Sequence, residues 1–251
     1  MTYSNYLTFV WTWFVVGLIT FVVLLFKTAP YGRHTRSDWG PLINNRLGWF
    51  VMEVTVLIVL SWYLIIYNEG VTWTELFLIT PFYIHYLHRG LIYPFRIRTG
   101  IKKMPLVIAL MAVFFNLING SLFGLYFTFF ADYSFSWLLD SRFAAGLFIF
   151  LLGAFINIKA DNYLISLRKP GETSYKIPRG WLFEYVSSPN LLGEMIEWLG
   201  YAIITWSLPG FVFFAWTCFN LIPRALAHHR WYKEKFVEYP PQRKAFIPFA
   251  W

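Results

Sequence analysis

The chain has 251 residues, of which 58% are hydrophobic, 22% aromatic and only 14% charged, and its mean hydropathy is +0.51. Because soluble domains carry charge on about a quarter of their residues, this composition excludes an ordinary soluble domain and indicates an integral membrane protein. The net charge of +8 does not indicate nucleic-acid binding, because the basic residues alternate with the apolar segments along the chain.

Seven segments are apolar and long enough to cross the hydrocarbon core of a bilayer, which is about 30 Å thick. They are residues 7–26, 49–67, 73–93, 106–130, 143–167, 191–206 and 211–226. The first has no basic leader and is longer than the apolar core of a signal peptide, so we expect a retained helix. Pro209 and Gly210 favour a turn between the last two segments. The sequence therefore predicts an all-α, seven-helix transmembrane bundle in which residues 1–251 form a single domain.

Basic residues are distributed unequally between the two sides of this predicted bundle. Twenty of the 21 Lys and Arg residues fall in residues 27–48, 89–103, 159–180 and 224–251, which are alternate connections, and Arg142 falls on the opposite side. The positive-inside rule assigns the basic side to the cytoplasm. We therefore expect the N-terminus outside and the C-terminus in the cytoplasm. The rule holds equally for a bacterial inner membrane and for the endoplasmic reticulum, so it does not distinguish them.

Charged and amide side chains interrupt the apolar sequence most strongly between residues 157 and 198. Each such group at membrane depth costs on the order of 2.5–3.5 kcal/mol on insertion scales, so these residues are functional candidates. Asn157 and Asp161 are four residues apart and share one helix face, and Asn190 and Glu194 repeat that spacing. A carboxylate beside an amide is suited to the hydroxyl and amide groups of a nucleotide.

Basic residues accompany this stretch on the predicted cytosolic side. Topology alone explains any one of them, but an Arg guanidinium also presents the planar fork that phosphate groups accept. The basic residues of the two cytosolic loops concerned are Arg98, Lys102, Lys103, Arg168, Lys169, Lys176 and Arg179. The sequence has no G-x-G-x-x-G turn and no P-loop. The combination favours a dinucleotide held between helices rather than on a Rossmann turn.

Glu53 and Tyr86 form a second candidate site, because each is a polar group inside an apolar segment. A carboxyl buried in such a segment tends to stay protonated. A protonated Glu and a Tyr hydroxyl can both donate hydrogen bonds to one carbonyl oxygen, as in an oxyanion hole. The alternative is that each group satisfies a backbone carbonyl of a neighbouring helix.

The histidines and the single cysteine do not predict a metal site. Two histidine pairs, at 85/88 and 228/229, faintly resemble the boxes of membrane di-iron oxidases, but those sites use many more histidines than the five present. Cys218 lies in an apolar run, which excludes a disulfide framework and a cysteine-based metal site. His88 with Arg89, and His228 with Arg224 and Arg230, are better suited to anion or amide contacts.

Several motifs together resemble the steroid 5α-reductase family. They are YGRH (31–34), WFVMEV (49–54), HYLHRGLIYP (85–94), NG (119–120), INIKADNYL (156–164), LRKPGETSYKIPRG (167–180), LFEYVSSPNLLGEMIEWLGYAI (182–203), NLIPRALAHHRWYKEKF (220–236) and YPPQRKAFIPFAW (239–251). The resemblance extends over nearly the whole chain and is most specific from Asn157 onward. It implies a seven-helix oxidoreductase of the membrane, a 3-oxo-5α-steroid 4-dehydrogenase that uses NADPH to reduce the 4,5 double bond of 3-oxo-Δ4 steroids.

The resemblance also implies roles for individual residues. Glu53 and Tyr86 correspond to the catalytic pair that binds and polarises the steroid 3-keto oxygen, and Trp49 and Trp198 to aromatic neighbours of the substrate. The residues that correspond to the NADPH cradle, mostly within a cofactor-binding part of about 105–251, are Asn157, Asp161, Arg168, Tyr175, Asn190, Glu194, Arg224, His228 and Tyr232, with Arg98 as an approximate phosphate ligand. We expect NADPH to be preferred over NADH, an apolar substrate to enter from the bilayer, and the protein to be a monomer.

Two stretches depart from the family pattern. Glu53 is followed by Val54, Thr55 and Val56, where animal members carry Leu-Pro-Ser. The run after HYLHR lacks the Asn-Arg-Gly-Arg sequence of some steroid enzymes. The shape of the acceptor pocket therefore does not follow from the resemblance, and a steroid, a sterol-like terpenoid and a polyprenoid enone all remain open as acceptors.

Two other function classes fit parts of the sequence. A membrane methyltransferase of the isoprenylcysteine or phospholipid type, using S-adenosylmethionine, also pairs a proline with a downstream Gly-Glu, as Pro189 and Gly193-Glu194 do. Glu53 and Tyr86 have no evident role in that enzyme. A non-enzymatic lipid carrier has no need for the polar cluster of residues 157–198. Retention of NADPH or of S-adenosylmethionine by the purified protein separates the three classes.

Overall fold

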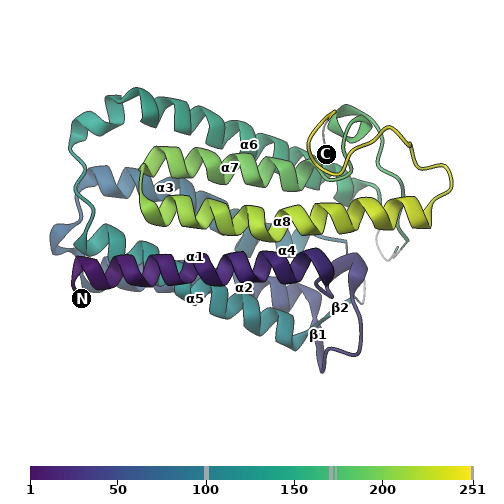
Figure 1. Ribbon diagram of the computed structural model, residues 1–251, viewed down its shortest axis with the longest axis horizontal. Helices are drawn as coiled ribbons and strands as arrows, with labels where there is room; N and C mark the ends of the chain where they lie inside the picture. The colour runs from purple at the N-terminus through teal and green to yellow at the C-terminus, as the bar shows by residue number, and fades with distance from the viewer. Residues whose placement is uncertain (99–101, 170–171, 173, 250–251) are drawn as a thin grey trace.

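The computed structural model describes residues 1–98, 102–169, 172 and 174–249. Residues 99–101, 170–171, 173 and 250–251 lie outside the described residues, and they include parts of two of the motifs, 167–180 and 239–251. The described chain forms a bundle of long helices that run roughly side by side, with a small sheet at one end (Figure 1). In that view the N-terminus lies at the end opposite the sheet and the C-terminal segment.

Helices account for most of the described chain. The α-helices are α1 (Tyr3–Phe26), α2 (Asn45–Ile66), α3 (Trp73–Leu87), α4 (Tyr93–Arg96), α5 (Leu106–Phe129), α6 (Ser141–Ser166), α7 (Pro189–Thr205) and α8 (Leu208–Lys235). Short 3₁₀ turns are η1 (Gly32–His34), η2 (Asn68–Gly70), η4 (Phe135–Leu139) and η5 (Trp181–Glu184), and η3 (His88–Ile92) is a π-helical turn. The strands β1 (Leu42–Asn44) and β2 (Lys103–Pro105) pair antiparallel.

The prediction of a mostly helical membrane protein is confirmed. Within the described residues, five helices, α1, α2, α5, α6 and α8, are long and apolar enough to cross a membrane. The other two predicted segments are helical but shorter, since α3 has 15 residues and α7 has 17. The helix of α3 continues through η3 and α4 as far as Arg96. The count of seven spans and their orientation remain predictions.

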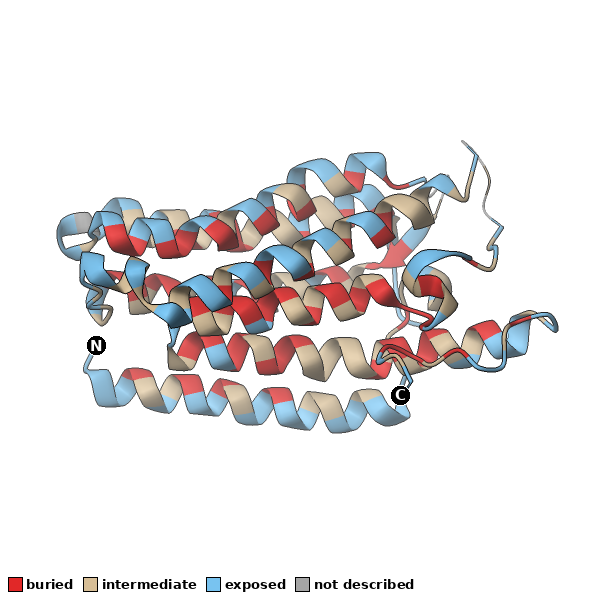
Figure 2. Ribbon diagram, turned by 90° about the horizontal axis from the view of Figure 1, so that it is seen from above, coloured by how far each residue is buried: buried red, intermediate tan, exposed pale blue. Residues whose placement is uncertain are grey.

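The outward faces of the helices carry many exposed apolar side chains, while the buried residues face the interior of the bundle (Figure 2). Phe148, Leu110 and Ile58 are among the large apolar residues with more than half of their surface exposed. A surface of this kind is stable in hydrocarbon and costly in water, because apolar area exposed to water is unfavourable. Inward-facing side chains therefore hold the helices together and the outward ones face lipid.

Helices α6 and α7 lie in close contact because glycines replace side chains between them. A Cβ atom on Gly193 would lie 2.5 Å from the backbone nitrogen of Asn157, and one on Gly146 would lie 2.6 Å from that of Ile204. No side chain fits at such distances, so small residues at regular spacing let the two backbones approach, as in other membrane helix pairs. This contact brings the polar faces of α6 and α7 together.

Helix α1 is attached to the bundle mainly through its first half. The Tyr6 hydroxyl donates to the carbonyl of Leu122 at 3.0 Å, and the indole of Trp13 donates to Asn119 at 3.3 Å. The indole of Trp216 on α8 in turn donates to the carbonyl of Trp13 at 2.9 Å. Asn119, a polar residue inside an apolar span, therefore has a structural partner on α1.

Candidate active site between the helices

A large cavity of about 820 Å³ lies inside the bundle and extends toward the end that carries β1 and β2. All of the predicted site residues except Asn157 line it. They are Trp49, Glu53, Tyr86, Arg98, Asp161, Arg168, Tyr175, Asn190, Glu194, Trp198, Arg224, His228 and Tyr232. Five of the helices, α2, α3, α6, α7 and α8, and the loops between them thus bring residues that lie far apart in the chain around one space.

Glu53 on α2 and Tyr86 on α3 line this cavity from adjacent helices. Neither the Glu53 carboxyl nor the Tyr86 hydroxyl has a hydrogen-bond partner within the described residues, so neither satisfies a backbone carbonyl of a neighbouring helix there. Tyr83, on the same helix as Tyr86, shows the contrast, because its hydroxyl shares a 2.7 Å hydrogen bond with Ser61. The polar atoms of Glu53 and Tyr86 are thus available to a ligand in the cavity.

Aromatic rings fix the position of Tyr86. Its ring centroid lies 4.7 Å from that of Phe82 and 5.9 Å from that of Trp198. Trp198 is itself only 2% exposed and lies 4.6 Å from the ring of Phe213. Since rings packed on several sides have few alternative rotamers, the Tyr86 hydroxyl is held in one direction. The surrounding wall also keeps this part of the cavity apolar.

Arg89 binds two carboxylates at the centre of the polar stretch. It donates to Asp161 on α6 at 2.7 Å and to Glu194 on α7 at 2.8 Å. Asn190 donates to the second oxygen of Asp161 at 3.0 Å. The guanidinium of Arg89 also lies 4.7 Å from the ring centroid of Tyr93. Both charges of each pair are therefore compensated inside the protein, which is what a buried ion pair requires.

The π-helical turn η3 explains how Arg89 reaches this place. Pro94 has no backbone N–H to donate to the carbonyl of Gly90, and its ring would clash with that carbonyl in a regular α-helix. The wider turn at His88–Ile92 relieves this conflict. Gly90 also faces α2 closely, because a Cβ there would lie 3.4 Å from the Cβ of Glu53. The turn therefore brings Arg89 and Glu53 toward the same cavity.

Asn157 lies behind the cavity rather than on its wall. Its amide donates to the carbonyl of Asn190 at 2.9 Å and to Glu194 at 3.3 Å. It thereby supports two cavity residues on the neighbouring helix. The anion or amide contacts expected of Arg89 are made with carboxylates of the protein itself, those of Asp161 and Glu194.

A cluster of basic and aromatic residues surrounds the mouth of the cavity near β2. The Arg168 guanidinium lies 4.3 Å from the ring centroid of Tyr175, and the Tyr175 hydroxyl accepts a 2.9 Å hydrogen bond from Lys102. Arg98 donates to the carbonyl of Arg168. The guanidinium of Arg33 lies 4.6 Å from the ring centroid of Tyr232. Aromatic faces hold these cations without neutralising them.

A second layer of this mouth contains two stacked histidines beside Arg224. The rings of His34 and His228 lie 5.3 Å apart, and the Arg224 guanidinium lies over the ring of Tyr31 at 3.5 Å. Burial, together with the nearby charges of Arg224 and Arg33, lowers the pKa of His34 to about 4. His34 is therefore neutral at pH 7, and the positive charge here comes from arginine.

Several polar side-chain atoms at the mouth are buried without a partner among the described residues. Arg33 Nη1 and Arg224 Nη1 make no hydrogen bond within the described residues, and the same holds for Nε2 of His34 and of His228. A buried unsatisfied donor costs about 1–3 kcal/mol. An anion with several oxygens would satisfy these groups, and phosphate is such an anion. The donor set therefore fits the phosphate groups of a nucleotide cofactor.

Three residues of the cavity mouth, Tyr31, Arg33 and His34, were not among the site residues predicted from the sequence. They belong to the YGRH motif, which the sequence marked without assigning a role. The signal that could have identified Arg33 is its place in a basic loop on the same predicted side as Arg168. Among the described residues, no group of three or more His, Cys, Asp and Glu side chains is arranged to hold a metal ion.

Comparison with known proteins identifies the family of this chain. The family model described as 3-oxo-5-alpha-steroid 4-dehydrogenase matches residues 102–251. "Steroid 5-alpha-reductase DET2" of Gossypium hirsutum is 45% identical over 250 residues, which cover 96% of this chain and 95% of that protein. "3-oxo-5-alpha-steroid 4-dehydrogenase 1" of Bos taurus is 42% identical over 240 residues, covering 93% of this chain and 92% of that protein.

A third relative, "3-oxo-5-alpha-steroid 4-dehydrogenase 2" of Rattus norvegicus, is 42% identical over 241 residues, with 92% of this chain and 91% of that protein covered. These similarities span plant and animal proteins and nearly the full length of each. The chain belongs to the 3-oxo-5-alpha-steroid 4-dehydrogenase family.

Proposed function

We propose that this protein reduces the 4,5 double bond of 3-oxo-Δ4 steroids or of similar apolar enones, with NADPH as the reductant. The observation that carries the proposal is the pair formed by Glu53 and Tyr86, whose polar atoms face an otherwise largely apolar cavity and have no partner among the described residues. The names of the relatives support steroid as the substrate class.

The role of the pair follows from the chemistry of an enone. Addition of hydride at the β-carbon moves negative charge onto the carbonyl oxygen. The Tyr86 hydroxyl donates a hydrogen bond to that oxygen, and Glu53 in its protonated form supplies a second donor. Both bonds strengthen as the charge develops, so they stabilise the transition state more than the bound substrate. The α-carbon then takes up a proton through the enol.

The residues at the mouth of the cavity would hold the cofactor. Arg33, Arg168 and Arg224 are suited to the phosphate groups, and Asp161 and Asn190 to ribose hydroxyls. NADPH, when bound, supplies the hydride. The extra 2′-phosphate of NADPH gives the unpaired arginine donors an acceptor that NADH lacks, which is why we propose that NADPH is preferred. Because Arg33 and Arg98 precede residue 105, the proposed cofactor site extends beyond the part 105–251.

The apolar wall excludes water from the reaction. Trp198, Phe213 and Phe115 line the cavity together with apolar residues of α1 such as Val16 and Leu24. Removal of water strengthens each hydrogen bond to the developing oxyanion. We propose that substrate enters from the bilayer, between the second half of α1 and helix α5, which both border the cavity.

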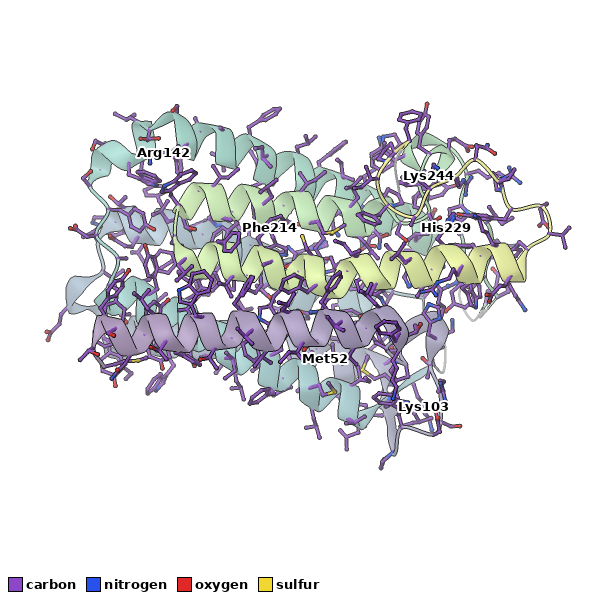
Figure 3. All side chains as sticks on the ribbon, viewed as in Figure 1. Met52, Lys103, Arg142, Phe214, His229 and Lys244 are labelled. Atoms are coloured by element: carbon purple, nitrogen blue, oxygen red, sulfur yellow. The ribbon has the colours of Figure 1, made fainter. Side chains whose placement is uncertain are left out.

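We also propose seven spans with the basic end of the bundle in the cytoplasm. Arg142 lies at one end, whereas Lys103 and Lys244 lie at the other (Figure 3). A reporter fused to the C-terminus should then be cytoplasmic, and one inserted near Asp132 should be outside. Finding both on the same side would contradict the seven-span topology. We also propose that the enzyme acts as a monomer.

The decisive experiment uses the purified full-length protein in lipid nanodiscs. We expect it to retain NADPH and to convert a 3-oxo-Δ4 steroid into its 5α-reduced product, detected by mass spectrometry. A methyltransferase would bind S-adenosylmethionine instead, and a carrier would bind the steroid without converting it. Retention of neither cofactor, with steroid returned unchanged, would refute the proposal.

A further inference from the structure

A second cavity lies on the flank of the bundle between α3 and α6 and has a volume of about 490 Å³. We call it the flank groove, and its lining residues are Phe77, Thr80, Pro81, Ile84, His85, His88, Phe143, Leu147, Phe150, Leu151, Ala154, Phe155, Asn157, Ile158 and Glu197. Helix α6 packs closely against α7, and the groove separates α6 from α3. The volume lies in the range of small-molecule sites, about 300–1,000 Å³.

The groove is open toward the bilayer. Phe77 and Ile84 on one bank are each 59% exposed, and Leu151 and Phe155 on the other bank are 57% and 56% exposed. These residues lie within helices whose outward faces are apolar. A molecule dissolved in the bilayer therefore reaches the groove without crossing water, and apolar contact with these side chains holds it there.

The floor of the groove is polar. His85 Nδ1 donates to Oε1 of Glu197 at 2.8 Å, and the two side chains are only 6% and 4% exposed. Within the described residues, the second oxygen of Glu197 and Nε2 of His85 have no hydrogen-bond partner. Both residues line the flank groove, and neither lines the large cavity. The two free polar atoms are therefore available only to a ligand in the groove.

The charges around the floor restrict the ligand. No Lys or Arg lines the groove among the described residues, so an anionic headgroup would meet Glu197 without a compensating cation. An acyl chain would fill the space but leave the Glu197 oxygen unpaired. A hydroxyl both donates and accepts, so it donates to Glu197 and accepts from Nε2 of His85 when both ring nitrogens of that histidine carry protons.

We propose that the flank groove is a ligand site distinct from the large cavity, and that it binds an apolar alcohol of sterol size with its hydroxyl on Glu197 and His85. Glu197 and Trp198 are adjacent on α7 but line different cavities. The alcohol therefore lies on the far side of Trp198 from the large cavity. Binding requires neither cofactor nor turnover, so the proposal is independent of the proposed function.

The test uses the full-length protein in nanodiscs with a photoactivatable sterol that carries a free hydroxyl. After irradiation, labelled peptides are mapped by mass spectrometry. We expect the label on residues 77–88 and 143–158, and we expect excess unlabelled sterol to remove it. A hydrocarbon with the same ring body but no hydroxyl should compete at least about tenfold less well, because it loses a hydrogen bond to a charged group. Saturating 3-oxo-Δ4 steroid should leave this labelling in place.

Two variants test the apolar space of the groove and its polar floor separately. Ala154→Phe fills the space without touching the polar floor and should abolish labelling. Ala145→Phe is its control, since Ala145 is exposed on the same helix and does not line the groove. Glu197→Gln keeps the size of the side chain and should weaken labelling about tenfold through loss of the charged acceptor.

The proposal is overturned if no peptide of the groove is labelled, or if the hydrocarbon competes as well as the sterol. It is also overturned if Ala154→Phe labels like Ala145→Phe. Should Ala154→Phe fail to fold, the hydrocarbon competition and Glu197→Gln still decide. Absence of reductase activity in the same preparation would refute the proposed function and leave this result unchanged.

Discussion

Two sets of polar side chains lie among the apolar helices, and they differ in whether the protein satisfies them. Arg89, Asp161 and Glu194 form ion pairs of 2.7 and 2.8 Å with one another. Glu53 and Tyr86 line the same cavity but have no hydrogen-bond partner in the described part of the chain. A buried polar group with hydrogen-bond partners on other helices holds those helices together. A buried polar group that lacks partners is available to bind a ligand.

We expect the largest effect, a loss of stability, from a substitution in the ion-paired set of Arg89, Asp161 and Glu194. Arg89→Ala leaves Asp161 and Glu194 without their cation, and breaking a buried ion pair in this way costs about 3–5 kcal/mol. We expect a large drop in thermal stability in detergent, measured by the unfolding of the purified protein. Arg230→Ala removes an exposed arginine and should be near neutral. Equal melting temperatures for the two variants would show that Arg89 is not structural.

The next largest effect should be a loss of catalytic rate, from a substitution in the pair without partners, Glu53 and Tyr86. Tyr86→Phe removes one donor to the developing oxyanion, which typically lowers kcat by about 10²–10³. Stability and NADPH affinity should change little, because the hydroxyl has no protein partner. Tyr83→Phe is the control, since that hydroxyl bonds Ser61 and does not line the cavity. Full activity of Tyr86→Phe on a 3-oxo-Δ4 steroid would exclude Tyr86 as the hydrogen-bond donor to the carbonyl oxygen.

Arg33 at the mouth resembles the second set, because its Nη1 also has no partner within the described residues, and Arg168 lines the same mouth. Arg168→Ala and Arg33→Ala should each raise the KM for NADPH by about tenfold or more, the value of a charge-assisted hydrogen bond. The KM for NADH should rise less, which steady-state kinetics with both cofactors can measure. Lys169→Ala provides the control, being exposed in the same loop and outside the cavity lining. An unchanged NADPH KM would remove that arginine from the cofactor site.

The smallest change in kcat should come from a variant that keeps the shape of the Glu53 side chain but removes its acidity. Glu53→Gln retains a donor in nearly the same position, so we expect kcat to fall by less than about tenfold. Glu53→Ala removes the donor and should approach the loss seen in Tyr86→Phe. Product formation under single-turnover conditions compares the two. If Glu53→Gln were as inactive as Glu53→Ala, proton transfer by the carboxyl, rather than hydrogen bonding, would be required.

Much of the architecture was predictable from local sequence. Apolar length and composition identified the helices, because a segment in hydrocarbon must satisfy its own backbone hydrogen bonds. The i,i+4 spacing of Asn157 with Asp161, and of Asn190 with Glu194, correctly placed each pair on one helix face. Within the described residues, thirteen of the predicted site residues line one cavity.

Which polar groups pair with each other could not be read from spacing. Arg89 belongs to the HYLHR run, but its carboxylate partners lie 72 and 105 residues away along the chain. The close contact of α6 with α7 that aligns those partners depends on glycines meeting backbone atoms of another helix. Only the three-dimensional packing decides such contacts.

The sequence by itself therefore determined the membrane class, the helical segments and the residue types of the site, because these follow from composition and from the geometry of a single helix. The tertiary structure alone decided which of the buried polar groups are neutralised and which remain free. Arg89 is neutralised because α6 and α7 bring carboxylates to it, whereas Tyr86 remains free because its hydroxyl faces the cavity. That difference is a property of packing between helices distant in the chain, and it separates the groups whose charge the protein compensates from those that have no partner within the described residues.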